Sequence, residues 1–146
     1  MEIYEVLKKD HKAVAELFEQ IEKTTERSHK GRKDLFATLR GALLPHAQAE
    51  QEVFYKPLLA RVEKRDLLLE AFEEHHVLEL MFDDIERCPV DDEGWLAKVT
   101  VLREVVEHHV KEEEGELFKV ARKHFSKEEA QEIGEKMKAR KAALIG

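Results

Sequence analysis

The sequence predicts an all-α protein, an antiparallel up-down-up-down four-helix bundle with an additional C-terminal helix. The chain of 146 residues is 42% hydrophobic and 39% charged and has only 6 Gly and 3 Pro, a composition that suits long amphipathic helices and not a turn-rich β fold. Apolar residues recur at helical spacing along one side of four long segments. Short polar connections favour antiparallel neighbours. The length fits one domain, so residues 1–146 are predicted to form a single one.

The first two segments form a predicted helical hairpin. The apolar spacing predicts one helix from about residue 2 to 25, and a polar loop follows it. A second helix is predicted from about 32 to 63, with Pro45 inside it. Proline lacks the backbone N–H that a helix interior uses, so we expect a bend just before His46.

The next two segments form a second predicted hairpin. One helix is expected from about 66 to 86 and another from about 93 to 124, which completes a bundle over about 2–124. Ser126 followed by Glu129 has the spacing of a capping box. This pair predicts the start of the C-terminal helix, over about 126–144.

Charge and composition exclude several classes of function. The formal net charge is -7 and the basic residues are interspersed with acidic ones, so no basic patch favours nucleic acid as a partner. The apolar runs are short, as at 67–69, which argues against a membrane span or a signal peptide. Cys88 is the single cysteine and cannot form an internal disulfide. These features predict a cytoplasmic protein in a reducing compartment.

The two hairpins show an internal repeat. The stretch DHKAVAELFEQI at 10–21 matches EHHVLELMFDDI at 74–85, with an acid and a histidine in the same places. His11 therefore aligns with His75, 64 residues later, and His46 is followed by His109 after 63 residues. The spacing indicates a duplicated helical hairpin.

Polar residues occupy the buried stripes of all four helices. His46 and Glu50 are four residues apart, and so are His109 and Glu113. Positions four apart lie on the same helix face one turn from each other, so each pair can direct an imidazole and a carboxylate at one point inside the bundle. The remaining two helices add one imidazole each, and the six candidate metal ligands are His11, His46, Glu50, His75, His109 and Glu113.

A purely structural polar core is the alternative interpretation, since a lone buried histidine is more often a hydrogen-bonded core residue than a ligand. Burying two carboxylates and four imidazoles costs several kcal/mol per unpaired ion, however, and no Lys or Arg lies on these stripes to offset that cost. A pair of divalent cations removes the problem. Mixed imidazole and carboxylate ligands without thiolate favour iron or manganese, and two carboxylates can bridge two ions.

The pattern resembles the hemerythrin-like family, also called HHE cation-binding domains. That family has His, His-x-x-x-Glu, His and His-x-x-x-Glu on four antiparallel helices, and the resemblance extends over about residues 3–124, including EEEGELF at 112–118. The resemblance implies a carboxylate-bridged, non-haem site with two iron ions that binds or reacts with O2, peroxide or NO. It gives the six residues named above the role of metal ligands, with manganese or zinc as substitutes for iron.

Some ligand assignments remain open at this point. Glu114 is an alternative to Glu113, because oxygen-carrying hemerythrins use a five-residue spacing there. Those carriers also have a further histidine one turn after the third-helix histidine, where this chain has Glu79. Glu79 is therefore either a third carboxylate near the site or a solvated acid, and its presence weighs against reversible oxygen carriage.

The residues around the ligands suggest further roles. His76 and His108 adjoin the two ligand histidines of the second hairpin and are expected to be flanking polar positions. Tyr4 and Tyr55 lie about one turn from ligand positions, so either is a candidate donor to a metal-bound ligand or an ordinary bundle residue.

Several activities fit these observations. The primary expectation is a protein whose partner is a small diatomic or peroxide ligand, with peroxide- or NO-consuming enzyme activity left open. The alternatives are an iron- or oxygen-responsive sensor or interaction module without turnover, and iron buffering. The oligomeric state does not follow from the sequence.

Overall fold

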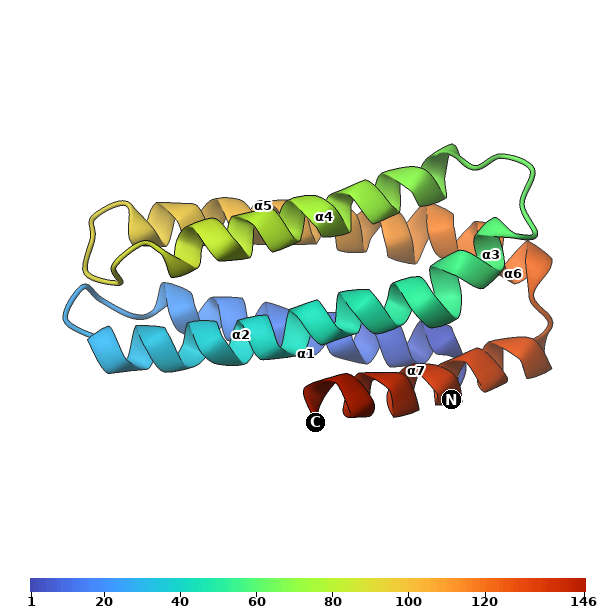
Figure 1. The fold of residues 1–146 in the computed structure, drawn as a ribbon, viewed down its shortest axis with the longest axis horizontal. Coiled ribbons are helices and arrows are strands. Elements are labelled where there is room, and N and C mark those ends of the chain that lie inside the picture. The colour runs from blue at the N-terminus through green and yellow to red at the C-terminus, as the bar shows by residue number, and fades with distance from the viewer.

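The computed structural model describes residues 1–146, and all of its regular elements are helices (Figure 1). Four rods run antiparallel to their chain neighbours, and a further helix lies beside the first two rods. The elements are α1 Ile3–Glu22, α2 His29–Glu50, η1 Gln51–Tyr55, α3 Lys56–Leu59, α4 Asp66–Glu86, α5 Trp95–Glu112, η2 Glu113–Leu117, α6 Phe118–His124 and α7 Lys127–Ile145. The predicted four-helix bundle with an additional C-terminal helix is confirmed.

The first and third rods are α1 and α4, whereas the second rod consists of α2, η1 and α3 and the fourth of α5, η2 and α6. In the second and fourth rods, a π-helical segment interrupts the α-helix, as η1 between α2 and α3 and as η2 between α5 and α6. Glu50 is the last residue before η1, and Glu113 is the first residue of η2. π-Helical insertions are often found at functional sites, and here both adjoin a candidate ligand carboxylate.

The sequence did not indicate these π-helical segments. It predicted an irregularity at Pro45 instead, but α2 continues as α-helix through Pro45 to Glu50. Whether the helix axis bends there stays a prediction. The departure from α geometry begins at Gln51, six residues later on the same rod.

The C-terminal helix begins with the predicted capping box. The Ser126 Oγ accepts a hydrogen bond from the Glu129 backbone N–H at 3.1 Å, and the Glu129 carboxylate accepts one from the Ser126 N–H at 3.0 Å. Further along α7, Gly134 packs against the start of the chain so closely that a Cβ there would lie 2.1 Å from the Met1 carbonyl oxygen. Helix α7 is therefore held tightly against the N-terminal end of α1.

The apolar core is divided into two clusters. One cluster lies at the end of the bundle that α7 covers and includes Leu7, Phe54 and Phe118. The other lies toward the opposite end and includes Phe82 and Trp95. One buried histidine on every rod falls between members of these two clusters, so the histidine layer is enclosed by apolar packing on both sides. None of the helices has the length and hydropathy that crossing a membrane requires.

Candidate metal centre

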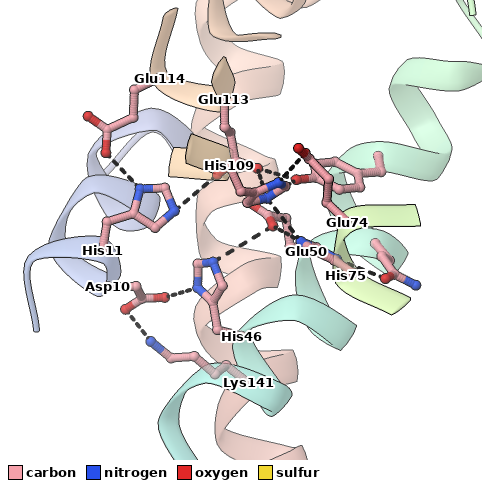
Figure 2. A network of polar contacts seen from close by, with 12 residues as sticks. Asp10, His11, His46, Glu50, Glu74, His75, His109, Glu113, Glu114 and Lys141 are labelled. Carbon is pink, nitrogen blue, oxygen red and sulfur yellow. Dashed lines mark hydrogen bonds and ion pairs between the residues drawn. The ribbon is translucent and has the colours of Figure 1, made fainter. Parts of the chain in front are cut away.

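The structure brings the six predicted ligand residues together at the centre of the bundle (Figure 2). They come from four different rods, and each is at most 7% exposed. The set is His11 on α1, His46 and Glu50 on α2, His75 on α4, His109 on α5, and Glu113 in η2.

The ligand atoms fall into two groups that could each hold an ion. One group consists of His11, His46, Glu50 and Glu113, and the other of Glu50, His75 and His109, so Glu50 belongs to both. Glu50 Oε1 lies 3.1 Å from His75 Nε2 and 3.7 Å from His46 Nε2. Glu113 lies 3.0 Å from His11 through Oε1 and 3.5 Å from His109 through Oε2. Each carboxylate thus contacts imidazoles of both hairpins.

Several of these buried atoms have no hydrogen-bond partner. They are both carboxylate oxygens of Glu50, one oxygen of Glu113 and the Nε2 of His11. Glu50 is completely buried, and leaving a buried carboxylate unpaired costs several kcal/mol. A donor set of inward-facing imidazole nitrogens and carboxylate oxygens fits divalent cations.

The outward-facing nitrogen of every ligand histidine has a protein partner. Each Nδ1 lies 2.6 to 2.8 Å from a side-chain oxygen of a carboxylate or an amide. Such partners fix the ring orientation and place the proton on Nδ1, which leaves the Nε2 lone pair free for a metal. The four pairs are His11 with Glu114, His46 with Asp10, His75 with Gln51 and His109 with Glu74.

The pKa values of the two ligand histidines of the second hairpin are shifted in opposite directions. Burial, together with the nearby His109, lowers the pKa of His75 to about 3. Burial alone would also lower the pKa of His109, but the Glu113 and Glu74 carboxylates raise it to about 9. Burial and the neighbouring Glu113 raise the pKa of Glu50 well above its ordinary value. These surroundings therefore disfavour the ionised form of the Glu50 carboxyl group unless a cation lies beside it.

The two alternative acidic ligands occupy other places. Glu114 does not face the centre: its carboxylate accepts from the Nδ1 of His11 at 2.6 Å, on the outer side of the ring. Glu79 lies on the exposed side of α4 and belongs to neither group. Of the two interpretations of Glu79, its exposure favours the solvated acid over a third carboxylate near the site.

Of the two candidate tyrosines, one contacts the ligand residues and the other has no hydrogen-bond partner. The Tyr55 hydroxyl donates a hydrogen bond to Glu113 and lies 3.1 Å from His109 Nε2, so it reaches the centre. The Tyr4 hydroxyl is buried and has no hydrogen-bond partner. His76 and His108 are exposed, as expected for flanking positions.

Sequence reasoning missed the residues that hold the histidines from outside. Asp10 and Glu74 were visible only as the acid before the histidine in each copy of the repeat, and that shared acid was the available signal. Gln51 gave no signal, because its role depends on η1 and on the neighbouring hairpin. Lys141 was also missed, although its Nζ lies 2.5 Å from Asp10 Oδ1.

Comparisons with known proteins show the family and support the fold. The family model described as Hemerythrin HHE cation binding domain matches residues 2–121. The crystal structure of a Hemerythrin HHE cation binding domain-containing protein from Mycobacterium kansasii, an Rv2633c homolog, superposes with a TM-score of 0.87 at 28% identity, over 100% of this chain and 88% of that one. A protein named DNA nickase from Nostoc sp. (strain PCC 7120 / SAG 25.82 / UTEX 2576) is 25% identical over 144 residues. That match includes 99% of this chain but only 40% of the relative's length.

Proposed function

The chain belongs to the family of hemerythrin HHE cation-binding domains, and from that premise we propose that it holds two iron ions and binds or reacts with O2, peroxide or NO. The observation that carries this proposal is Glu50, which is fully buried, has two carboxylate oxygens without a hydrogen-bond partner and is shared by both groups of ligand atoms. A carboxylate in that position is suited to bridge two cations.

The ligand types support iron or manganese over calcium. Four imidazoles and two carboxylates, with no thiolate, match the preferences of iron and manganese. Zinc also accepts these donors, whereas calcium prefers an all-oxygen set. We therefore propose iron as the resident metal and manganese or zinc as substitutes.

The protein residues prepare the site for small ligands. The outer partners of the histidines keep each Nε2 directed inward, and the apolar clusters on both sides exclude water. Bound iron would supply a redox-active Lewis acid for oxygen or nitrogen ligands. Tyr55 places a hydroxyl donor beside Glu113 and His109. Because Glu79 is exposed, the helix that carries His75 adds no second ligand there, which leaves room for an exogenous ligand and favours reaction over reversible carriage.

Metal content tests the first half of the proposal. Protein loaded anaerobically with Fe2+ and then desalted is expected to retain about two iron atoms per chain, as bundles of this kind do with facing carboxylates and histidines. Metal analysis alongside circular dichroism measures this. A folded protein that retains no iron under these conditions would contradict the proposal.

Optical spectra test the second half. Spectra of the Fe2+ protein before and after air, peroxide and NO are expected to change, with peroxide or NO consumed. An oxygen-dependent band that disappears under vacuum would indicate carriage instead, and no spectral change with any of the three would indicate sensing or buffering.

We do not assign to this chain the activity named for the DNA nickase relative. This chain matches 40% of that protein's length, and its acidic residues outnumber its basic ones. We place the proposed activity in the cytoplasm, where the free thiol of Cys88 suits the reducing conditions.

A further inference from the structure

Helix α7 lies outside residues 2–121, which the family model matches, yet one of its side chains is part of the network around the metal centre. The Lys141 Nζ donates to Asp10 Oδ1 at 2.5 Å, and Asp10 Oδ2 lies 2.8 Å from His46 Nδ1 (Figure 2). Lys141 is 25% exposed and Asp10 is 16% exposed, so water screens this pair less than it screens surface pairs. A continuous chain of contacts therefore connects α7 to a candidate ligand.

Two further contacts fix α7 in this position. The Arg140 guanidinium bonds Glu52 in η1 through both oxygens, at 2.5 and 3.3 Å. Gly134 packs directly against the Met1 carbonyl oxygen. Helix α7 is therefore held against the start of α1 and also against the π-helical segment that follows Glu50.

The arrangement around His46 is distinct from that around the other ligand histidines. Asp10 is the only one of the four Nδ1 partners that forms an ion pair with a Lys or Arg. Glu114 has no such cation, Glu74 forms ion pairs only with histidines, and Gln51 is neutral. The cation restricts the Asp10 rotamer, which keeps the second carboxylate oxygen against His46 Nδ1.

We propose that α7 acts as a clasp, a helix whose docking stabilises the metal position that His46 would serve. Lys141 is the positioning residue, and it acts through Asp10. This inference rests on the proposed metal binding. Removing an outer partner of a metal ligand weakens binding by about 10- to 100-fold, and Lys141 is one step further out, so we expect the lower end of that range. Linkage makes the effect reciprocal, so metal binding also tightens the docking of α7.

The first test compares Lys141→Met with Lys138→Met in the full chain. Lys138 is also on α7 but pairs only with Glu135 of the same helix, at 3.8 Å. Each protein is loaded with Co2+, and release to excess EDTA is followed by the visible absorption of the bound ion. We expect Lys141→Met to release one of its ions about 10-fold faster than the wild type, Lys138→Met to match the wild type, and Lys141→Arg to restore slow release.

The second test measures the reciprocal effect by hydrogen exchange. Co2+ should slow amide exchange in α7 of the wild type and of Lys138→Met, and it should do so much less in Lys141→Met. Gly134→Ala provides an independent variant, because its Cβ would displace α7 while leaving Lys141 in the sequence. It should also release an ion faster, and it replaces Lys141→Met if circular dichroism shows that the latter is unfolded.

The outcomes separate the clasp from the proposed metal binding. Wild-type protein that binds no Co2+ would overturn both. Wild-type protein that binds two Co2+ while Lys141→Met releases both at the wild-type rate would overturn the clasp alone. Equal acceleration in Lys141→Met and Lys138→Met would also overturn it, because the effect would then follow from any loss of charge on α7.

Discussion

The two helical hairpins of the bundle use the same connections around the centre. In each, the acid before the first histidine contacts the second histidine of the same hairpin. The residue after the ligand carboxylate contacts the first histidine of the other hairpin. Corresponding residues are Asp10 and Glu74, His11 and His75, His46 and His109, Glu50 and Glu113, Gln51 and Glu114, and Tyr55 and Phe118.

The hairpins differ in the residues outside the ligands. Gln51 is neutral where Glu114 is acidic, and Tyr55 carries a hydroxyl where Phe118 has none. Helix α7 packs on the first hairpin, α1 and α2. The repeat therefore keeps the candidate ligands and varies their surroundings, so we expect the two metal positions to differ in affinity.

The largest expected effect comes from removing the carboxylate that both metal positions share. Glu50→Gln should lower the retained metal from about two ions per chain to less than one, because a neutral amide cannot bridge two cations or offset their charge. Metal analysis after desalting measures this. Glu79→Gln, on the exposed face of α4, should retain the wild-type amount. Two ions retained by Glu50→Gln would show that the positions are independent.

The next test removes the charge of the acid that precedes the first histidine, in one hairpin at a time. Asp10→Asn and Glu74→Gln keep an oxygen for the histidine Nδ1 but lose the negative charge, and each should weaken metal binding by about 10- to 100-fold. Competition with a chelator gives the affinities. The larger loss is expected for Asp10→Asn, which also leaves Lys141 without its partner. An equal loss in both variants would mean that α7 adds nothing to the asymmetry.

A smaller effect is expected from the hydroxyl that the second hairpin lacks. Tyr55→Phe makes the two hairpins alike at this position and removes a buried donor to Glu113, which should cost about 1 to 3 kcal/mol in the metal-free protein. Tyr4→Phe is the matched control, since its buried hydroxyl has no partner and its loss should be neutral or stabilising. Urea unfolding measures both variants, and equal destabilisation would argue against a specific Tyr55 contact.

The last prediction concerns the pH dependence of the metal-free protein, in which the two ligand histidines of the second hairpin act in opposite directions. The folded-state pKa of His75 is lowered to about 3, so its contribution to stability is present above its ordinary value of 6.5 and is lost as the pH falls toward 3. The folded-state pKa of His109 is raised to about 9, so its contribution is present below 6.5 and is lost as the pH rises toward 9.

Together these two histidines predict a stability maximum near pH 6.5, measured by urea unfolding from pH 4 to 9. Gln51→Glu gives His75 an acidic partner like that of His11, which should raise its pKa and reduce the loss of stability on the acid side. An unchanged acid limb in Gln51→Glu would indicate that burial and the nearby His109 control the pKa of His75.

Much of the fold could be predicted because each helix carries its own signal. The predicted range of about 66 to 86 agrees with α4, and the Ser126 and Glu129 capping box begins α7 as expected. The second rod, by contrast, ends at Leu59 and not near residue 63. Helix ends and π-helical segments depend on tertiary packing as well as on local spacing, which limits their prediction from sequence.

The candidate site could likewise be predicted only in part. His46 with Glu50 and His109 with Glu113 were predictable because four-residue spacing places each pair on one helix face. Glu114 and Glu79 could not be placed from the sequence, because neighbouring or one-turn spacings leave the direction of a side chain open. The fold directs Glu114 to the outer side of His11 and leaves Glu79 exposed.

The sequence by itself determined the helices, the duplicated hairpin and the six polar residues on the buried stripes, because these depend on periodicity within single segments. Only the tertiary structure decided which side chains hold the histidines from outside. The contacts of Gln51 with His75 and of Lys141 with Asp10 join residues from separate helices. Their partners depend on how the rods pack and on where the π-helical segments fall, and no local pattern in the chain records that arrangement.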